Sequence, residues 1–207
     1  MVQLDRVITS GIFSLDGGDF EVENNVWIIG DDREAIVIDA AHDHRAILEG
    51  LGGLTFRAIV STHGHNDHIN AAADLADETN APILLHPDDS MLWEVVYPDR
   101  RIDDTLRDGQ KITVGGAELS IIHTPGHSPG GCCLHLPEDG LLFSGDTLFN
   151  GGPGATGRSF SSYDTILDSI EHKLFTLPGH TTVHTGHGDS TQLAVEASHL
   201  AEWRGQQ

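Results

Sequence analysis

Basic side chains are scarce in this 207-residue sequence, which holds 11 lysines and arginines against 32 aspartates and glutamates. Its formal net charge is −21 with the histidines neutral, and no basic cluster that would form a phosphate-binding stripe is apparent. A field of this sign repels polyanions, including nucleic acid and anionic lipid surfaces. We therefore expect no nucleic-acid or membrane partner, and a small molecule as the substrate.

Long apolar runs and spaced cysteines are missing as well. No run of about 20 apolar residues occurs, and residues 1–13 lack the charged start and apolar stretch of a secretory signal, so we expect a cytoplasmic protein. Cys132 and Cys133 are adjacent, which disfavours a bond between them and predicts buried strand thiols. A chain of this length buries a core without such links, and we expect one domain over residues 1–207.

The hydrophobic pattern predicts an α/β protein. Three strand-like segments open the chain, and helices and strands then alternate. The expected strands are residues 2–13, 22–29, 35–38, 56–60, 83–85, 111–114, 117–122, 132–136, 141–144 and 181–184. The expected helices are residues 44–51, 69–79, 88–95 and 163–174, and a last one entered through Ser190. This order favours a four-layer αββα sandwich, with two mixed sheets face to face and helices outside.

Four metal-ligand residues crowd into six positions where the apolar segment 56–60 ends. They are His63, His65, Asp67 and His68. A loop at a strand end holds side chains on a rigid support, and His-x-His places two rings on one side of an extended segment. Asp67 and His68 enter the next helix and can point to a neighbouring position, which suggests a pair of metal sites. A cluster of three imidazoles has no packing purpose and would repel itself when protonated.

Three further ligand candidates follow apolar runs elsewhere in the chain. His127, Asp146 and His187 each lie in a turn rich in glycine or serine. Small neighbours let an ion and the backbone approach each ligand closely. Five other histidines, His42 among them, are expected on surfaces or at helix ends.

These motifs resemble those of metallo-β-lactamase-fold proteins. The resemblance rests on His-x-His-x-Asp-His at residues 63–68, His-Thr-Pro-Gly-His-Ser at 123–128, Ser-Gly-Asp-Thr at 144–147 and Gly-His-Gly at 186–188, and it covers residues 20–196. The residues Leu177-Pro178 and the stretch 186–191 with Glu196 are similar to the glyoxalase II-like branch, whose members hydrolyse hydroxyacyl thioesters. The resemblance implies the same αββα fold that the alternation predicts.

The resemblance also implies a ligand for each position of a binuclear centre. One ion is held by His63, His65 and His127, the other by Asp67, His68 and His187, and Asp146 bridges them. The expected cofactors are two divalent ions, zinc first, with iron or manganese as alternatives. Asp39, Thr62 and His123 are predicted to orient the ligands from behind.

The expected reaction is hydrolysis of an ester-like bond, with a thioester of a small thiol carrier as the substrate. Two ions about 3.5–4 Å apart lower the pKa of a shared water, so hydroxide is the nucleophile. Asp67 and Asp146 are the expected catalytic carboxylates, and Asp67 can hold the hydroxide and accept its proton. Only residues 188–207 follow His187, so the thiol-binding cations of glyoxalase II are not supplied there; Arg158 is the candidate substrate contact.

Other activities stay open. A persulfide-oxidising dioxygenase of the same superfamily uses one iron on the face of His63, His127 and Asp146. A lactonase is less favoured, because such enzymes tend to place a tyrosine where this chain has Leu148-Phe149. A zinc β-lactamase is less favoured still, because the common ones carry cysteine in place of Asp146. A non-catalytic binding role is a further alternative, and the oligomeric state is left open.

Overall fold

The computed structural model describes residues 2–205 and contains two six-stranded sheets. In the first sheet, β1 to β3 pair antiparallel and β3 to β6 pair parallel, so the sheet is mixed. Its strands, in spatial order, are β1 (Gln3–Leu15), β2 (Gly18–Gly30), β3 (Glu34–Ile38), β4 (Thr55–Val60), β5 (Ile83–Leu85) and β6 (Asp104–Thr105).

The second sheet is mixed too, because β10 and β13 pair parallel while the other neighbours pair antiparallel. In spatial order its strands are β14 (Thr191–Gln192), β13 (Thr182–Thr185), β10 (Leu141–Gly145), β9 (Cys132–Leu136), β8 (Ala117–His123) and β7 (Lys111–Val114). A small hairpin, β11 (Leu148–Phe149) and β12 (Gly152–Pro153), follows β10.

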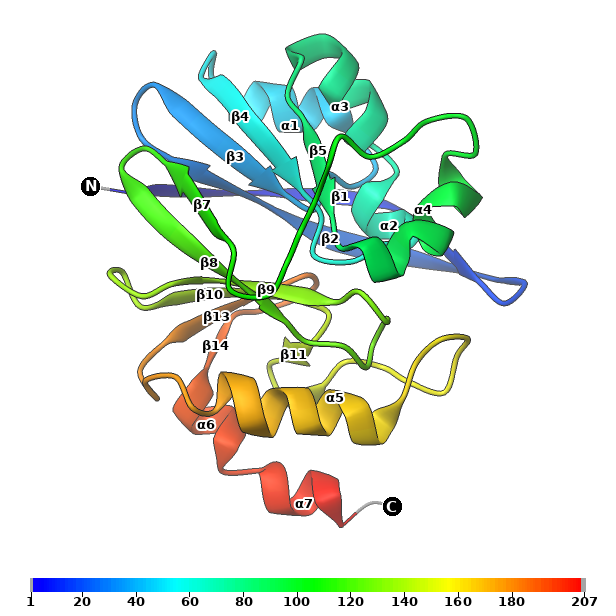
Figure 1. Cartoon of the computed structure of the whole chain (residues 1–207), viewed down its shortest axis with the longest axis vertical. Helices are drawn as coiled ribbons and strands as arrows, with labels where there is room; N and C mark the ends of the chain where they lie inside the picture. The colour runs from blue at the N-terminus through cyan, green and yellow to red at the C-terminus, as the bar shows by residue number, and fades with distance from the viewer. Residues whose placement is uncertain (1, 206–207) are drawn as a thin grey trace.

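The helices lie on the outer faces of the two sheets (Figure 1). On the first sheet these are α1 (His44–Gly50), α2 (Asn66–Ile69), α3 (Ala72–Thr79), the 3₁₀ turn η1 (Pro87–Asp89) and α4 (Ser90–Val96). On the second they are α5 (Tyr163–Ser169), its π-helical continuation η2 (Ile170–Leu174), α6 (Leu193–Ala197) and α7 (Leu200–Arg204). None of the described helices is long and apolar enough to cross a membrane.

The alternation of side chains along the strands divides the core into three layers. Ile36 faces the second sheet while its neighbour Val37 packs under the helices of the first. In the second sheet Phe143 joins the inter-sheet core, whereas Leu142 packs against α5 and η2. Three buried layers between four structural layers confirm the predicted αββα sandwich.

Two predicted helices are interrupted. The helix expected over residues 69–79 is α2 followed by α3, because Asn70 ends α2 and turns its side-chain oxygen to accept the N–H of His42. The helix expected from Ser190 begins only at Leu193 and is split into α6 and α7, because residues 191–192 pair with β13 as a strand. The strands β6, β11, β12 and β14 have only two residues each, so they show no alternation of apolar and polar residues from which a strand could be predicted.

We predict that Phe143→Ala lowers the free energy of unfolding by about 3–5 kcal/mol, because it opens a cavity between the two sheets. The Phe143 ring is fully buried and lies 6.0 Å from the ring of Trp27. Urea unfolding of the metal-loaded protein measures the change. Val195→Ala, on the exposed side of α6, is the control and should change stability by less than about 0.5 kcal/mol. Equal effects of the two substitutions would contradict the assignment of this core.

Candidate metal centre

The seven predicted ligands come together at one edge of the two sheets. Because the carboxyl ends of β3, β4, β8, β10 and β13 all lie at this edge, loops far apart in the sequence meet there. The ligands are His63, His65, Asp67 and His68 after β4, His127 between β8 and β9, Asp146 after β10 and His187 after β13.

Three imidazoles form the first group. Nδ1 of His65 lies 3.0 Å from Nε2 of His63 and 3.0 Å from Nε2 of His127. Two nitrogens bound tetrahedrally to one ion at about 2.0–2.1 Å lie roughly 3.3 Å apart, so the spacing fits a shared metal ion. One nitrogen of each ring lies within 4.8 Å of the others. A cation bound among them would be coordinated by three lone pairs, which protons alone cannot all satisfy.

Two imidazoles and a carboxylate form the second group. Nε2 of His68 lies 3.2 Å from Nε2 of His187, and Oδ2 of Asp67 lies 3.3 Å from the latter. Asp67 and His68 are buried, and His187 is partly exposed. The donor set is one that zinc and iron both accept.

Asp146 lies between the two groups. Its Oδ2 is 3.5 Å from Nε2 of His127 in the first group and 3.4 Å from Nε2 of His187 in the second. Its buried Oδ1 makes no well-aligned hydrogen bond within the described part of the chain and lies 3.3 Å from Nε2 of His68. A buried carboxylate oxygen needs a donor or a cation, and a metal ion would satisfy it. Residues 63–187 thus offer two ligand sets joined by one carboxylate.

The two groups differ in the charge that they carry before metal binds. Burial lowers the pKa of His65 to about 3, and it lowers the pKa of His63 far below its ordinary value, so both rings are neutral. Burial also opposes protonation of His187, but the Asp146 carboxylate raises its pKa to about 10. Asp146 and Asp67 likewise raise the pKa of His68 well above its ordinary value despite burial. Protons on the second group therefore balance its carboxylates.

Two glycines allow the strand ends to approach this closely. A Cβ on Gly186 would lie 2.3 Å from Oδ1 of Asp146 and 2.7 Å from Cε1 of His68. A Cβ on Gly145, whose φ is +49°, would lie 2.2 Å from Oγ1 of Thr62. Side chains at these positions would push the bridging carboxylate and the His-x-His loop apart.

Asp39 and Thr62 lie behind the ligands, at the positions predicted for orienting residues. The Asp39 carboxylate accepts hydrogen bonds from the Thr62 backbone N–H at 2.7 Å and the Thr62 hydroxyl at 2.8 Å. It also lies 3.0 Å from Nδ1 of His68, which leaves Nε2 of that ring for the metal. Oγ1 of Thr62 is 3.1 Å from Nδ1 of His63. One carboxylate therefore fixes a ligand of each group.

The structure does not place His123 where it could orient a ligand. Its ring stacks on His86, 4.1 Å away and nearly parallel, and its Nε2 lies 2.9 Å from the carbonyl oxygen of Pro129. None of the contacts that the structure gives its ring is with a predicted ligand, and the prediction for this residue is corrected accordingly. The ordered motif around His127 gave no information about the direction of a side chain four residues earlier.

Arg158 lies close to the centre without touching a ligand. Its guanidinium stacks over the ring of Phe20 at 4.5 Å and that of Phe13 at 5.5 Å. The Phe13 ring is in turn 5.4 Å from the ring of His65. The role of Arg158 in substrate binding stays a prediction.

The sequence gave no sign of the polar pair that supports Asp67. Asn24, fully buried on β2, donates a hydrogen bond from Nδ2 to Oδ2 of Asp67 at 3.2 Å. His42, expected at a surface or helix end, is instead half-buried, and its Nε2 is 2.9 Å from Oδ1 of Asn24. No local pattern links these residues, because only the pairing of β2 with β1 and β3 brings them to the site.

Asp89 is a second supporting residue that the sequence did not reveal. Its buried carboxylate accepts hydrogen bonds from the Gly64 N–H at 2.8 Å, the Ser128 hydroxyl at 2.7 Å and the Gly130 N–H at 2.6 Å. Gly64 belongs to the loop that carries His63, whereas Ser128 and Gly130 belong to the loop that carries His127. Asp89 therefore ties the two halves of the first ligand group together.

Comparison with known proteins agrees with this arrangement. The profile of the metallo-beta-lactamase superfamily matches residues 20–197. The probable metallo-hydrolase YqgX of Bacillus subtilis is 31% identical over 189 residues, 84% of this chain and 90% of that protein. Hydroxyacylglutathione hydrolase GloC of Haemophilus influenzae is 28% identical over 192 residues, 84% of this chain and 89% of that protein. The crystal structure of TTHA1623 in a di-iron-bound form superposes with a TM-score of 0.77 and 30% identity, covering 85% of this chain and 93% of that one.

The chain belongs to the metallo-beta-lactamase superfamily and has its fold. Membership agrees with the cluster of histidines and aspartates described above as a site for divalent metal ions. The superfamily resemblance predicted from the four motifs is confirmed, and so is the sandwich architecture.

We predict that Asp89→Asn weakens metal binding and lowers the free energy of unfolding by about 1–3 kcal/mol, because an amide replaces one acceptor oxygen with a donor facing a buried N–H or hydroxyl. Metal titration and urea unfolding measure the two effects. The control is Asp88→Asn, since the Asp88 side chain next along the chain is largely exposed. Unchanged metal affinity in Asp89→Asn would contradict the conclusion that Asp89 holds the loops of His63 and His127 together.

We further predict that acid removes the two ions in a fixed order. The raised pKa values of His68 and His187 mean that both rings bind protons increasingly as pH falls, whereas His63 and His65 stay neutral. Protons therefore compete with metal mainly at the second group. Dialysis of the loaded protein at a series of pH values, with metal analysis, should show a plateau at one ion per chain. Simultaneous loss of both ions would contradict it.

Proposed function

We propose that this chain is a binuclear metal-dependent hydrolase that cleaves thioesters of a small thiol carrier. The observation that carries the proposal is the position of Asp146, whose Oδ2 lies within 3.5 Å of ligand nitrogens of both groups. Such a carboxylate joins two ion positions into one centre. The similarity to a hydroxyacylglutathione hydrolase supports the thioester as the substrate class.

The metal ions, held by the two ligand sets, would supply a hydroxide nucleophile near neutral pH and polarise the acyl oxygen. Asp67 is suited to hold the attacking water, because the bond from Asn24 fixes its carboxylate and its pKa is lowered by His68 and His187 against the effect of burial. An ionised carboxylate at this position accepts the proton of the water. A thiolate leaves without protonation, so no general acid is required.

No cysteine is placed to act as the nucleophile instead. Cys132 and Cys133 are free and buried in β9, as the sequence predicted. Burial raises the pKa of Cys133 to about 11, and it raises that of Cys132 as well, so both stay protonated thiols. Neither cysteine therefore competes with water as the nucleophile.

The proposal predicts about two divalent ions per chain and hydrolysis of S-lactoyl and S-acetyl thioesters by the zinc-loaded protein. Asp146→Asn should lower kcat by more than about 100-fold, because it removes the shared anionic ligand. Asp168→Asn, an exposed position on α5, is the control and should leave kcat unchanged. Metal analysis and thiol release measure the two quantities.

Three results would overturn the proposal. One iron per chain with oxygen uptake on a persulfide would identify a dioxygenase. Lactone hydrolysis without thioester hydrolysis would identify a lactonase. Absence of turnover on all of these substrates in fully loaded protein would leave a metal-binding protein without this activity.

A further inference from the structure

A cavity of about 360 Å³ opens beside the metal centre. It lies between the tip of the β1–β2 hairpin, the loop that carries His65, helix α4 and the loop before α5. In Figure 1 the blue hairpin tip, green α4 and the yellow loop lie at the same end of the molecule. His65, a ligand of the first group, forms part of its wall. Of the seven predicted ligands only His65 lines the cavity, so a molecule bound here reaches the metal centre on the side of the first group.

The walls of this cavity are apolar and partly exposed. They include Leu15 on the hairpin, Leu92, Val95 and Val96 on α4, and Phe160 in the opposite loop. Val95 is 81% exposed and Phe160 is 59% exposed. Large apolar side chains that converge on a functional site without burying each other mark a surface for an apolar ligand.

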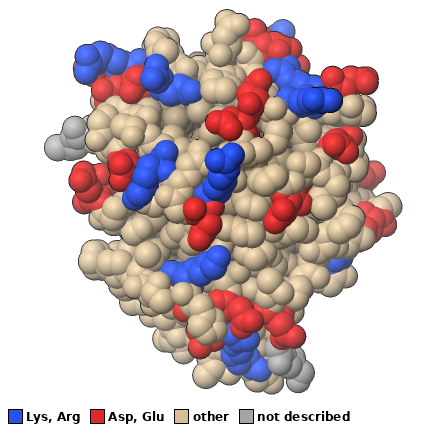
Figure 2. All heavy atoms as spheres, in the orientation of Figure 1, with Lys and Arg blue, Asp and Glu red and all other residues tan. Residues whose placement is uncertain are grey.

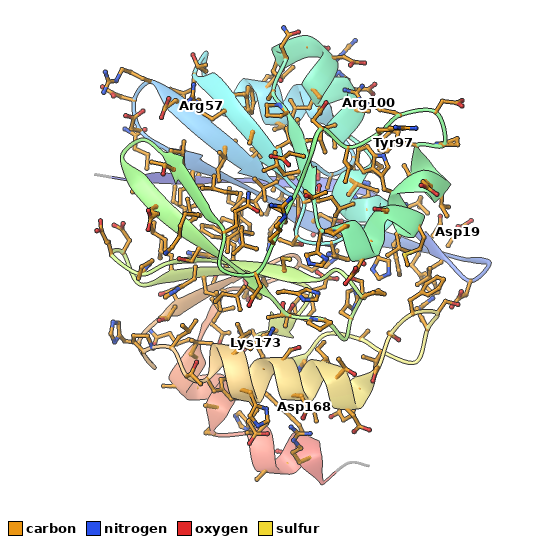
Figure 3. The ribbon with its side chains drawn as sticks, viewed as in Figure 1. Asp19, Arg57, Tyr97, Arg100, Asp168 and Lys173 are labelled. Carbon is orange, nitrogen blue, oxygen red and sulfur yellow. The ribbon has the colours of Figure 1, made fainter. Side chains whose placement is uncertain are left out.

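The charged side chains in the lining are acidic. Asp16 and Asp19 line the cavity at the hairpin tip, and no lysine or arginine belongs to its lining. Arg158 lies outside, over the rings of Phe13 and Phe20. Asp19 is labelled at the tip in Figure 3, and acidic side chains predominate on that side of the surface in Figure 2. A thiol carrier with carboxylate or phosphate groups would place its anions against these aspartates, so the carrier is not the occupant.

Hydrogen bonds fix the position of the cavity walls relative to the metal ligands. Asn66 accepts the Ser14 N–H at 2.8 Å and donates from Nδ2 to the carbonyl oxygen of Ile12 at 2.7 Å. Asp16 accepts the Ser159 N–H at 2.9 Å, which joins the hairpin tip to the opposite loop. Because Asn66 lies between two predicted ligands in sequence, the hairpin wall cannot shift without the metal loop.

We propose that this cavity binds the acyl group of the substrate and selects uncharged, apolar acyl chains of medium length. The inference rests on the proposed thioester hydrolysis and adds the chemistry of the acyl side. An extended acyl chain buries against Val95, Leu92 and Phe160 while its carbonyl carbon stays at the metal centre. A terminal carboxylate on the same chain faces Asp16 and Asp19 and is rejected.

The test uses acyl thioesters of one neutral thiol, N-acetylcysteamine, and the metal-loaded protein. The ratio of kcat/KM for the octanoyl ester to that for the acetyl ester should exceed about tenfold, since each methylene buried in an apolar pocket favours binding. The hexanoyl ester should exceed the adipoyl ester, which has the same six carbons with a terminal carboxylate, by about tenfold or more.

Val95→Glu places a carboxylate in the cavity at an exposed position and should lower the octanoyl-to-acetyl ratio by about tenfold. The matched control is Val195→Glu, a valine 51% exposed on α6, outside the lining of this cavity. Its ratio should equal that of the unsubstituted protein. Thermal unfolding and metal content of both variants show that each is folded and loaded.

The outcomes separate this inference from the function on which it rests. Turnover that is independent of acyl length, or equal for the hexanoyl and adipoyl esters, would overturn the acyl site and leave thioester hydrolysis standing. An unchanged ratio in Val95→Glu would also overturn it. Failure to hydrolyse any thioester would remove both.

Discussion

The crowding of the other six predicted ligand side chains around Asp146 is the constraint on which the rest of this structure depends. Their nitrogen and oxygen atoms approach one another to 3.0–3.5 Å. Such an arrangement has no hydrophobic reason to form, and within it the carboxylates of Asp146 and Asp67 raise the pKa of His68 and His187. The hydrophobic core of the sandwich offsets the cost of bringing these polar groups together, because three apolar layers fix the strands whose ends carry the ligands.

The two sheets must also be held together at the edge where the ligands meet. Trp27 and Asn25, both on β2, donate hydrogen bonds to the carbonyl oxygen of Thr185 at the end of β13, each at 3.0 Å. Asn25 also donates to the carbonyl oxygen of Gly188, just beyond His187. The last ligand is thereby attached to the first sheet. Polar bonds across an apolar interface are directional, so they fix the register that hydrophobic contacts leave open.

The parts of the site that could be predicted from the sequence are those whose residues lie within short segments of the chain. Residues 63–68 hold four ligands in six positions, and His127, Asp146 and His187 each stand beside glycine or serine at a strand end. The supports of these ligands are different in kind. Asn24 is far from its partner Asp67 in sequence, His42 acts through Asn24, and Asp89 binds the backbone of Gly64 beside His63. Their neighbours in sequence are ordinary strand or turn residues. Strand pairing and loop docking bring them to the site, and the hydrophobic periodicity of the sequence contains no information about such long-range contacts.

The same distinction explains why orientation was harder to predict than position. Asp39 and His123 each stand at or just beyond a strand end, at the same edge of the sandwich, and the sequence favoured an orienting role for Asp39 more strongly than for His123. The backbone decides between them. Asp39 takes a φ of +59°, which turns its carboxylate toward Thr62 and His68, whereas His123 continues β8 in register with Cys132 and stacks on His86. A residue other than glycine in the left-handed region is strained, and it persists where surrounding bonds hold it. The two hydrogen bonds from Thr62 hold Asp39, so part of the strain in this fold is maintained by the residues that orient its metal ligands.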